Sequence, residues 1–237
     1  MVSTAVPAES PHRAVAPAWH TIIVLALLLS VSLVGARSGS LPFVRAHGRV
    51  VGYLLVMAFE WVTVAFIAHG VGRRGLSLHS LIGGSWARPL AALRDLGIAL
   101  AFLIIVGAGV LNGLGYLLKA EPNQAIRHML PQARIEVILY LMMALTAGFC
   151  EEVIFRGYLQ RQFTAATQAA AGGIVLQGIA FGASHGYQGW KFMLLIVGYG
   201  ALFGLLAQWR RSLRPGMITH FLQDGIGGLL LARHFLR

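Results

Sequence analysis

The stretch Cys150-Glu151-Glu152-Val153-Ile154-Phe155-Arg156-Gly157 places two adjacent carboxylates and an arginine at the end of an apolar run that begins at Ile135. A charged side chain at the centre of a membrane helix costs roughly 2.5–3.5 kcal/mol on insertion scales, so such residues usually serve a function. Glu152 and Arg156 are four residues apart and share one helix face, which allows them to pair. Because Glu151 points about 100° away, we interpret Glu152 as structural and Glu151 as reactive.

The composition of the whole chain is typical of a membrane protein. Of its 237 residues, 57% are hydrophobic and 11% are charged, whereas about 25% are charged in an ordinary soluble domain. The net charge of +11 comes from basic residues spread over the connections between apolar segments, which argues against nucleic acid as a partner. The single cysteine, Cys150, excludes an internal disulfide and a cysteine-based zinc site.

Long apolar segments are the candidates for membrane-spanning helices, because a span needs about 20 mostly apolar residues. They lie at residues 21–36, 50–71, 96–118, 135–162, 168–185, 192–209 and 217–236. We therefore predict an all-α polytopic transmembrane bundle of about seven spans, within a range of six to eight. Arginines flank the segments on both sides, so the orientation stays open. Cleavage of residues 1–36 as a signal peptide also stays open, since Val34-Gly35-Ala36 resembles a peptidase site.

Glycines spaced four residues apart indicate where helices approach one another closely in lipid. Such sets are Gly109 with Gly113, Gly200 with Gly204, and Gly178 with Gly182 and Gly186. Since the chain has 29 glycines, some of these pairs are expected by chance.

Polar residues in the later apolar segments suggest a catalytic site. His220 and Asp224 are four apart and project from one helix face, and His185 follows a glycine-rich segment. A water held between a carboxylate and an imidazole suits general-base chemistry, and the second histidine with Asp224 would either donate to an oxyanion or complete a metal site. Two histidines and a carboxylate also form a known zinc ligand set, although no HExxH motif is present.

Two further acidic residues receive a simpler interpretation. Glu60 is expected to be a structural partner of a neighbouring helix or arginine. Glu136, near a helix start, is expected to be interfacial.

Three motifs resemble the CPBP family of intramembrane metalloproteases, which includes CAAX prenyl endopeptidases and bacterial Abi-like proteins. The motif Glu-Glu-x-x-x-Arg stands at Glu151–Arg156, Phe-x-x-x-His at Phe181–His185, and His-x-x-x-Asn/Asp at His220–Asp224. The resemblance covers about residues 135–230. Residues 1–18 are rich in Ala, Pro and Ser, and we expect them to form a disordered tail. The apolar segments predict N-terminal transmembrane helices at 19–134, and the resemblance implies a catalytic helix bundle at 135–237.

The resemblance also implies an activity: an endopeptidase in a bacterial cytoplasmic membrane that hydrolyses a membrane-embedded or lipid-modified peptide. Glu151 and His185 would activate water, while His220 and Asp224 would stabilise the oxyanion. Structural support would come from Glu152, Arg156 and Phe181. Whether a single Zn2+ is required, with Glu151, His185 and His220 as candidate ligands, stays open. The alternatives are a non-catalytic immunity or scaffold protein of the same fold and, less favoured, a transporter.

One geometric condition follows from the spans. If the segment 192–209 crosses the whole bilayer, His185 and His220 lie toward opposite faces. For the two histidines to meet Glu151, the break Gly186-Tyr187-Gln188-Gly189 must lie within the membrane and line a cavity. The helix that carries Glu151 must also continue past Arg156 to about Gln162.

Overall fold

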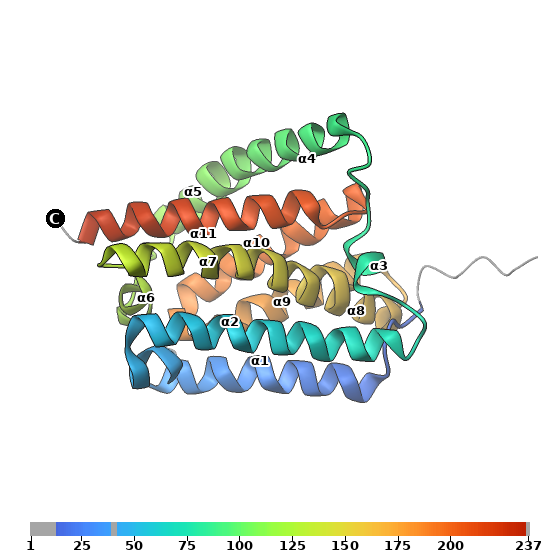
Figure 1. Ribbon diagram of the computed structural model, residues 1–237, viewed down its shortest axis with the longest axis horizontal. Coiled ribbons are helices and arrows are strands. Elements are labelled where there is room, and N and C mark those ends of the chain that lie inside the picture. Colours follow the sequence, from blue (N-terminus) through green and yellow to red (C-terminus); the bar gives the residue numbers. More distant parts are fainter. Residues whose placement is uncertain (1–12, 39–41, 236–237) are drawn as a thin grey trace, which may run out of the picture.

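The computed structural model describes residues 13–38 and 42–235, and every regular element in these ranges is a helix (Figure 1). The elements are α1 (Ala18–Ser38), α2 (Pro42–Gly72), α3 (Leu78–Ile82), α4 (Pro89–Phe102), η1 (Leu103–Leu111), α5 (Asn112–Leu117), α6 (Gln124–Met129), α7 (Arg134–Glu151), η2 (Glu152–Leu159), α8 (Gln160–Thr167), α9 (Ala170–Ser184), η3 (Gly186–Gln188), α10 (Trp190–Arg210) and α11 (Arg214–Phe235). The all-α prediction is confirmed.

Five helices of the described chain are long and apolar enough to cross a membrane. They cover Ala18–Arg37, Gly48–Gly72, Pro89–Leu117, Arg134–Thr167 and Trp190–Arg210. Two of the seven expected spans are not among them. The helix α9 has only 15 residues, which is shorter than the about 20 that a span needs. The helix α11 is long, but its sequence includes charged and amide side chains such as Arg214, Gln223 and Asp224.

The long helices run side by side in Figure 1, with α7 between α2 and α11, and these pairs are in contact. Behind them α9 packs against α10. In the same view α4 lies at the outer edge, beyond α11. Because α7 contacts helices from both halves of the chain, it occupies the centre of the bundle.

The central helix changes its winding at the double glutamate. The regular α-helix α7 ends at Glu151, and the eight residues from Glu152 to Leu159 form a π-helix that is buried throughout. The chain then continues as α8 to Thr167, so one helix runs from Arg134 to Thr167. The expected continuation past Arg156 is confirmed. Short π-helical turns often accompany functional sites, and here the change falls between the two carboxylates.

Glycines set the close contact between α9 and α10. A Cβ at Gly178 would lie 3.0 Å from the backbone N of Ala201 and the backbone O of Val197. Gly200 approaches Gly178 from the opposite helix. By contrast, Gly113 has no atom within 4 Å of a built Cβ, so the spacing of Gly109 and Gly113 does not mark a helix contact.

The residues before α1 are fixed to the central helix. Residues 1–12 of the expected disordered tail lie outside the described ranges, but Val15 and Ala16 are buried. Their backbone N–H groups donate to Oε1 of Gln162, over 2.8 and 3.2 Å. Further along, His20 contacts the hydroxyl of Tyr158 at 2.9 Å. Val15 and Ala16 are thus packed against the central helix.

The chain breaks between α9 and α10, as the sequence requires. A single 3-10 turn at Gly186–Gln188 is followed by Gly189, whose φ of 93° favours glycine. Ser32 of α1 fixes this break: its hydroxyl donates to the carbonyl of Ala183 over 2.6 Å and accepts from the N–H of Gly186 over 2.9 Å. The turn therefore holds His185 at the end of α9 in a defined position.

Candidate active site

The carboxylate of Glu151 lies between two imidazoles. Its Oε1 is 3.9 Å from Nε2 of His185, and its Oε2 is 3.4 Å from Nε2 of His220. The Glu151 side chain, at the end of α7, is 16% exposed, and those of His185 and His220 are 15% and 5% exposed. Three elements distant in sequence thus bring these three side chains together.

His220 faces carboxylates on both of its ring nitrogens. Nδ1 lies 3.1 Å from Oε1 of Glu152, while Nε2 lies 3.4 Å from Glu151 and 3.5 Å from Oδ2 of Asp224. An ionised carboxylate only accepts hydrogen bonds, so it matches a ring nitrogen that carries a proton. The arrangement therefore favours the imidazolium form of His220.

The surroundings of His185 favour a different protonation. Its Nδ1 is 2.9 Å from the backbone carbonyl of Phe181, which can only accept. The proton of a neutral imidazole therefore belongs on Nδ1, and Nε2 presents a lone pair toward Glu151. The separation of 3.9 Å between Nε2 and Oε1 is too long for a direct hydrogen bond. A polar separation of this size is suited to a bridging water.

Glu152 and Arg156 form the buried ion pair that their spacing predicts. Oε1 of Glu152 lies 3.1 Å from Nη1 of Arg156, and the side chains are 1% and 0% exposed. The guanidinium carbon lies 4.3 Å from the ring centre of Phe181 and 5.1 Å from that of Phe203, and Nη2 donates to the carbonyl of Gly200. These contacts join η2 to α9 and α10. The bond from His220 to Glu152, which the sequence did not predict, links the ion pair to the histidine.

Asp224 lies at the edge of the site. It is one helical turn after His220 and its side chain is 40% exposed. Its backbone carbonyl accepts a hydrogen bond from the hydroxyl of Tyr140 on α7, over 3.1 Å. Among the residues that the sequence singles out, Asp224 is therefore the one open to solvent or to a bound molecule.

A small cavity of about 70 Å³ adjoins Glu151 and His185. Its other lining residues are Leu28 and Val31 of α1, Val56, Phe59 and Glu60 of α2, Ile154 and Phe155 of η2, Ser184 of α9, and Tyr187 of η3. A site for one water needs a cavity of about 10–15 Å³, so this cavity is large enough to hold water beside Glu151 and His185. Glu60 is the residue that the sequence assigned to structural pairing. The sequence did not predict the position of Glu60 at the cavity, because a single acidic residue in an apolar segment does not indicate which neighbour its side chain faces.

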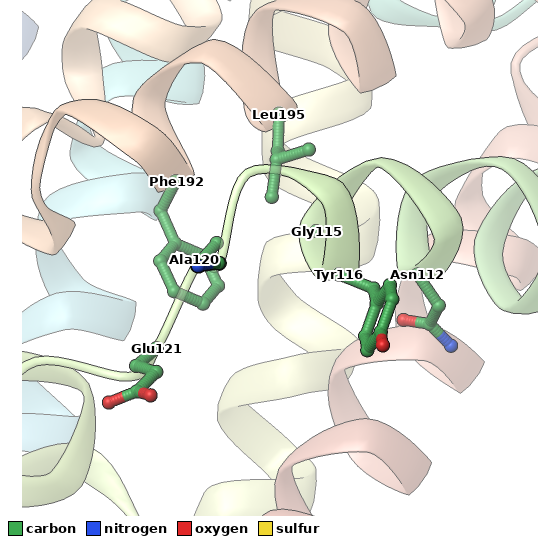
Figure 2. Close-up of a pocket in the computed structure, with 8 residues that line it drawn as sticks. Asn112, Gly115, Tyr116, Ala120, Glu121, Phe192 and Leu195 are labelled. Atoms are coloured by element: carbon green, nitrogen blue, oxygen red, sulfur yellow. The ribbon is translucent and has the colours of Figure 1, made fainter.

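A larger cavity of about 450 Å³ lies elsewhere. Figure 2 shows its lining, with Asn112, Gly115 and Tyr116 from α5 and Phe192 and Leu195 from α10. None of the motif residues lines this cavity. It is therefore separate from the candidate active site.

The candidate zinc ligands do not form a metal-binding group. Within residues 13–38 and 42–235, no three His, Cys, Asp or Glu side chains are placed to hold an ion together. Nε2 of His220 is shared by Glu151 and Asp224. We therefore derive no chemical step through a metal.

Part of the chain matches the model of a known protein family. Residues 133–226 match the family model of the Rce1-like type II CAAX prenyl endopeptidases. No curated protein and no solved structure matches the chain. The matched range includes the three motifs, whereas α1 to α6 lie outside it. With five helices able to cross a membrane, the chain is an integral membrane protein whose residues 133–226 match the family model of the Rce1-like type II CAAX prenyl endopeptidases.

Proposed function

We propose that the protein is an intramembrane endopeptidase, which hydrolyses a peptide bond of a membrane-associated substrate by means of a Glu151- and His185-activated water. The observation that carries the proposal is the position of Glu151, whose two carboxylate oxygens each face the Nε2 of a different histidine. The match to a family of endopeptidases supports the same activity.

The proposed reaction begins with a water that lies beside the pair and contacts both Oε1 of Glu151 and Nε2 of His185, two atoms that are 3.9 Å apart. The lone pair of His185 orients this water, and Glu151 accepts its proton as the oxygen attacks the peptide carbonyl. Negative charge then develops on the carbonyl oxygen. A preorganised donor at that position stabilises the transition state, and Nε2–H of His220 supplies it.

The remaining motif residues position these groups. Glu152 accepts from Nδ1 of His220, which fixes the ring and directs Nε2 toward the reaction. Arg156 neutralises Glu152, and its guanidinium lies against the ring of Phe181. Asp224, 3.5 Å from His220, completes the oxyanion site when it carries a proton and can donate.

The substrate class follows from the membrane location and the family. We propose a membrane-embedded or lipid-modified peptide, presented to the site in a bacterial cytoplasmic membrane. Lipid modification would retain such a peptide at the bilayer, where the cavity beside Glu151 is enclosed by the apolar helices α1 and α2.

Glu151→Gln is the variant that tests this proposal. Purified protein in proteoliposomes is given an S-farnesylated CAAX peptide and a single-span apolar peptide, and the products are identified by mass spectrometry. Removal of a general base is expected to lower the rate by about 10²–10⁴-fold without altering the thermal midpoint. Glu121→Gln, at an exposed carboxylate of the larger cavity, is the matched control. A wild-type protein that cleaves neither peptide would instead support a non-catalytic role.

A further inference from the structure

Glu60 is a second carboxylate at the catalytic cavity. It lies on α2, outside the matched family segment, and the residue is 7% exposed. Its side chain lines the same cavity of about 70 Å³ as Glu151 and His185. Among the described residues, its Oε2 has no hydrogen-bond partner. A buried polar atom left without a partner costs about 1–3 kcal/mol, so this position calls for an explanation.

The surroundings of Glu60 favour its neutral form over the ionised carboxylate. None of the ion pairs among the described residues includes Glu60, and the buried Arg156 is paired with Glu152. The ionisable groups that act on it are Glu151, His220 and Asp224, and His220 already lies against other carboxylates. An ionised carboxylate with no counter-charge is expensive to bury. A protonated Glu60 carries no charge and can donate a hydrogen bond into the cavity, so the protonated form fits this buried position better than the ionised form.

We propose that Glu60 is the proton donor to the leaving amine. This role rests on the proposed peptidase function, since it supplies a step that Glu151 and His185 leave open. Cleavage of an amide requires the departing nitrogen to gain a proton, because an amide anion is a very poor leaving group. Glu60 places an acid at the cavity on the wall formed by α2, separate from the base on α7.

The full step balances with these groups alone. Glu151 takes one proton from water while the hydroxide oxygen bonds to the carbonyl carbon. As the tetrahedral intermediate collapses, the C–N bond breaks and the nitrogen takes the proton of Glu60, which gives a carboxylic acid and an amine. Glu151 is then protonated and Glu60 is ionised. Transfer of the proton from Glu151 to Glu60 through the water of the cavity restores the starting state.

A leaving-group comparison tests this role. The probes are an S-farnesylcysteine peptide with an ordinary amide at the scissile position and the matching S-farnesylcysteine p-nitrophenyl ester. The nitrophenolate departs without a proton. For Glu60→Gln we expect kcat on the amide to fall by about 10²–10⁴-fold, the usual contribution of a general acid, while kcat on the ester stays within about three-fold of the wild type. Glu121→Gln should leave both rates unchanged.

The outcomes separate this proposal from the peptidase function itself. Glu151→Gln should lose both reactions, because water activation is needed for each; retention of both would overturn the peptidase mechanism. Equal effects of Glu60→Gln on amide and ester, or no effect on either, would show that Glu60 is not the donor even if the protein is a peptidase. If Glu60→Gln does not fold, Glu60→Asp replaces it, and the amide must again be slowed more than the ester.

Discussion

Replacement of Arg156 by methionine should reveal how strongly the fold depends on its buried ion pair. Methionine is unbranched and apolar, so it fills much of the space of the arginine side chain without its charge. The Arg156 side chain is 0% exposed and lies 3.1 Å from Glu152. Removal of one partner from a buried pair costs about 3–5 kcal/mol, because the other charge stays buried without compensation. We expect Arg156→Met to lower the free energy of unfolding by that amount.

A double-mutant cycle isolates the pair from the packing. Glu152→Gln removes the remaining charge, so Arg156→Met should be less damaging in that background. We expect the double variant to be more stable than the sum of the single effects by about 1–3 kcal/mol, the usual coupling between contacting groups. Arg233→Met, at an exposed arginine in the last turn of α11, should change stability by less than about 0.5 kcal/mol.

Unfolding by SDS titration in mixed micelles, followed by circular dichroism, measures these free energies. Additive single effects would refute the reasoning, since they would show that Glu152 and Arg156 do not stabilise one another. So would a loss below about 1 kcal/mol for Arg156→Met, because the guanidinium would then be hydrated rather than buried.

Substitutions at Gly178 and Asp224 test the helix contact and the edge of the site. Gly178→Val should destabilise the protein by about 1–3 kcal/mol, the usual effect of an overpacked contact, because the added Cβ would lie 3.0 Å from backbone atoms of α10. Gly113→Val is the control, because a Cβ at Gly113 would have no neighbouring element within 4 Å. Equal shifts of the thermal midpoint in the two variants would contradict the close packing of α9 and α10. Asp224→Asn should retain activity, because the amide also donates, whereas Asp224→Ala should lose about 10²–10³ in kcat, as for an oxyanion donor. Equal loss in both Asp224 variants would instead point to a need for the charge.

The sequence predicted best those features that depend on spacing within one helix. The pair of Glu152 with Arg156 and the proximity of His220 to Asp224 are both contacts between residues four apart, and helical periodicity alone determines which face such residues share. The number of membrane-spanning helices was harder to predict from the sequence. The predicted segment 168–185 contains α9, and apolar composition alone does not show that the helix itself covers only 15 residues.

Contacts between distant segments could not be predicted from spacing. The hydroxyl of Ser32 holds the break after α9, although a serine in an apolar run gives no indication of its partner. The bond between His220 and Glu152 depends on how α11 packs on η2. Glu60 reaches the cavity only because α2 packs against α7. In each case the tertiary arrangement, rather than local periodicity, decides the contact.

The walls of the small cavity come from two parts of the chain, one inside and one outside the segment that matches the family model. Glu151 and His185 lie within residues 133–226, the segment that matches the family model. The opposite wall is built by α1 and α2, whose contributions are Leu28, Val31, Val56, Phe59 and Glu60. Exchange of one apolar side chain for another on this wall would alter which substrate residues fit beside the scissile bond while the catalytic groups stay in place. Under the proposed function, substrate preference would therefore depend on the apolar side chains of α1 and α2, and single substitutions at Leu28 or Val56 would change it while Glu60 and Glu151 are retained.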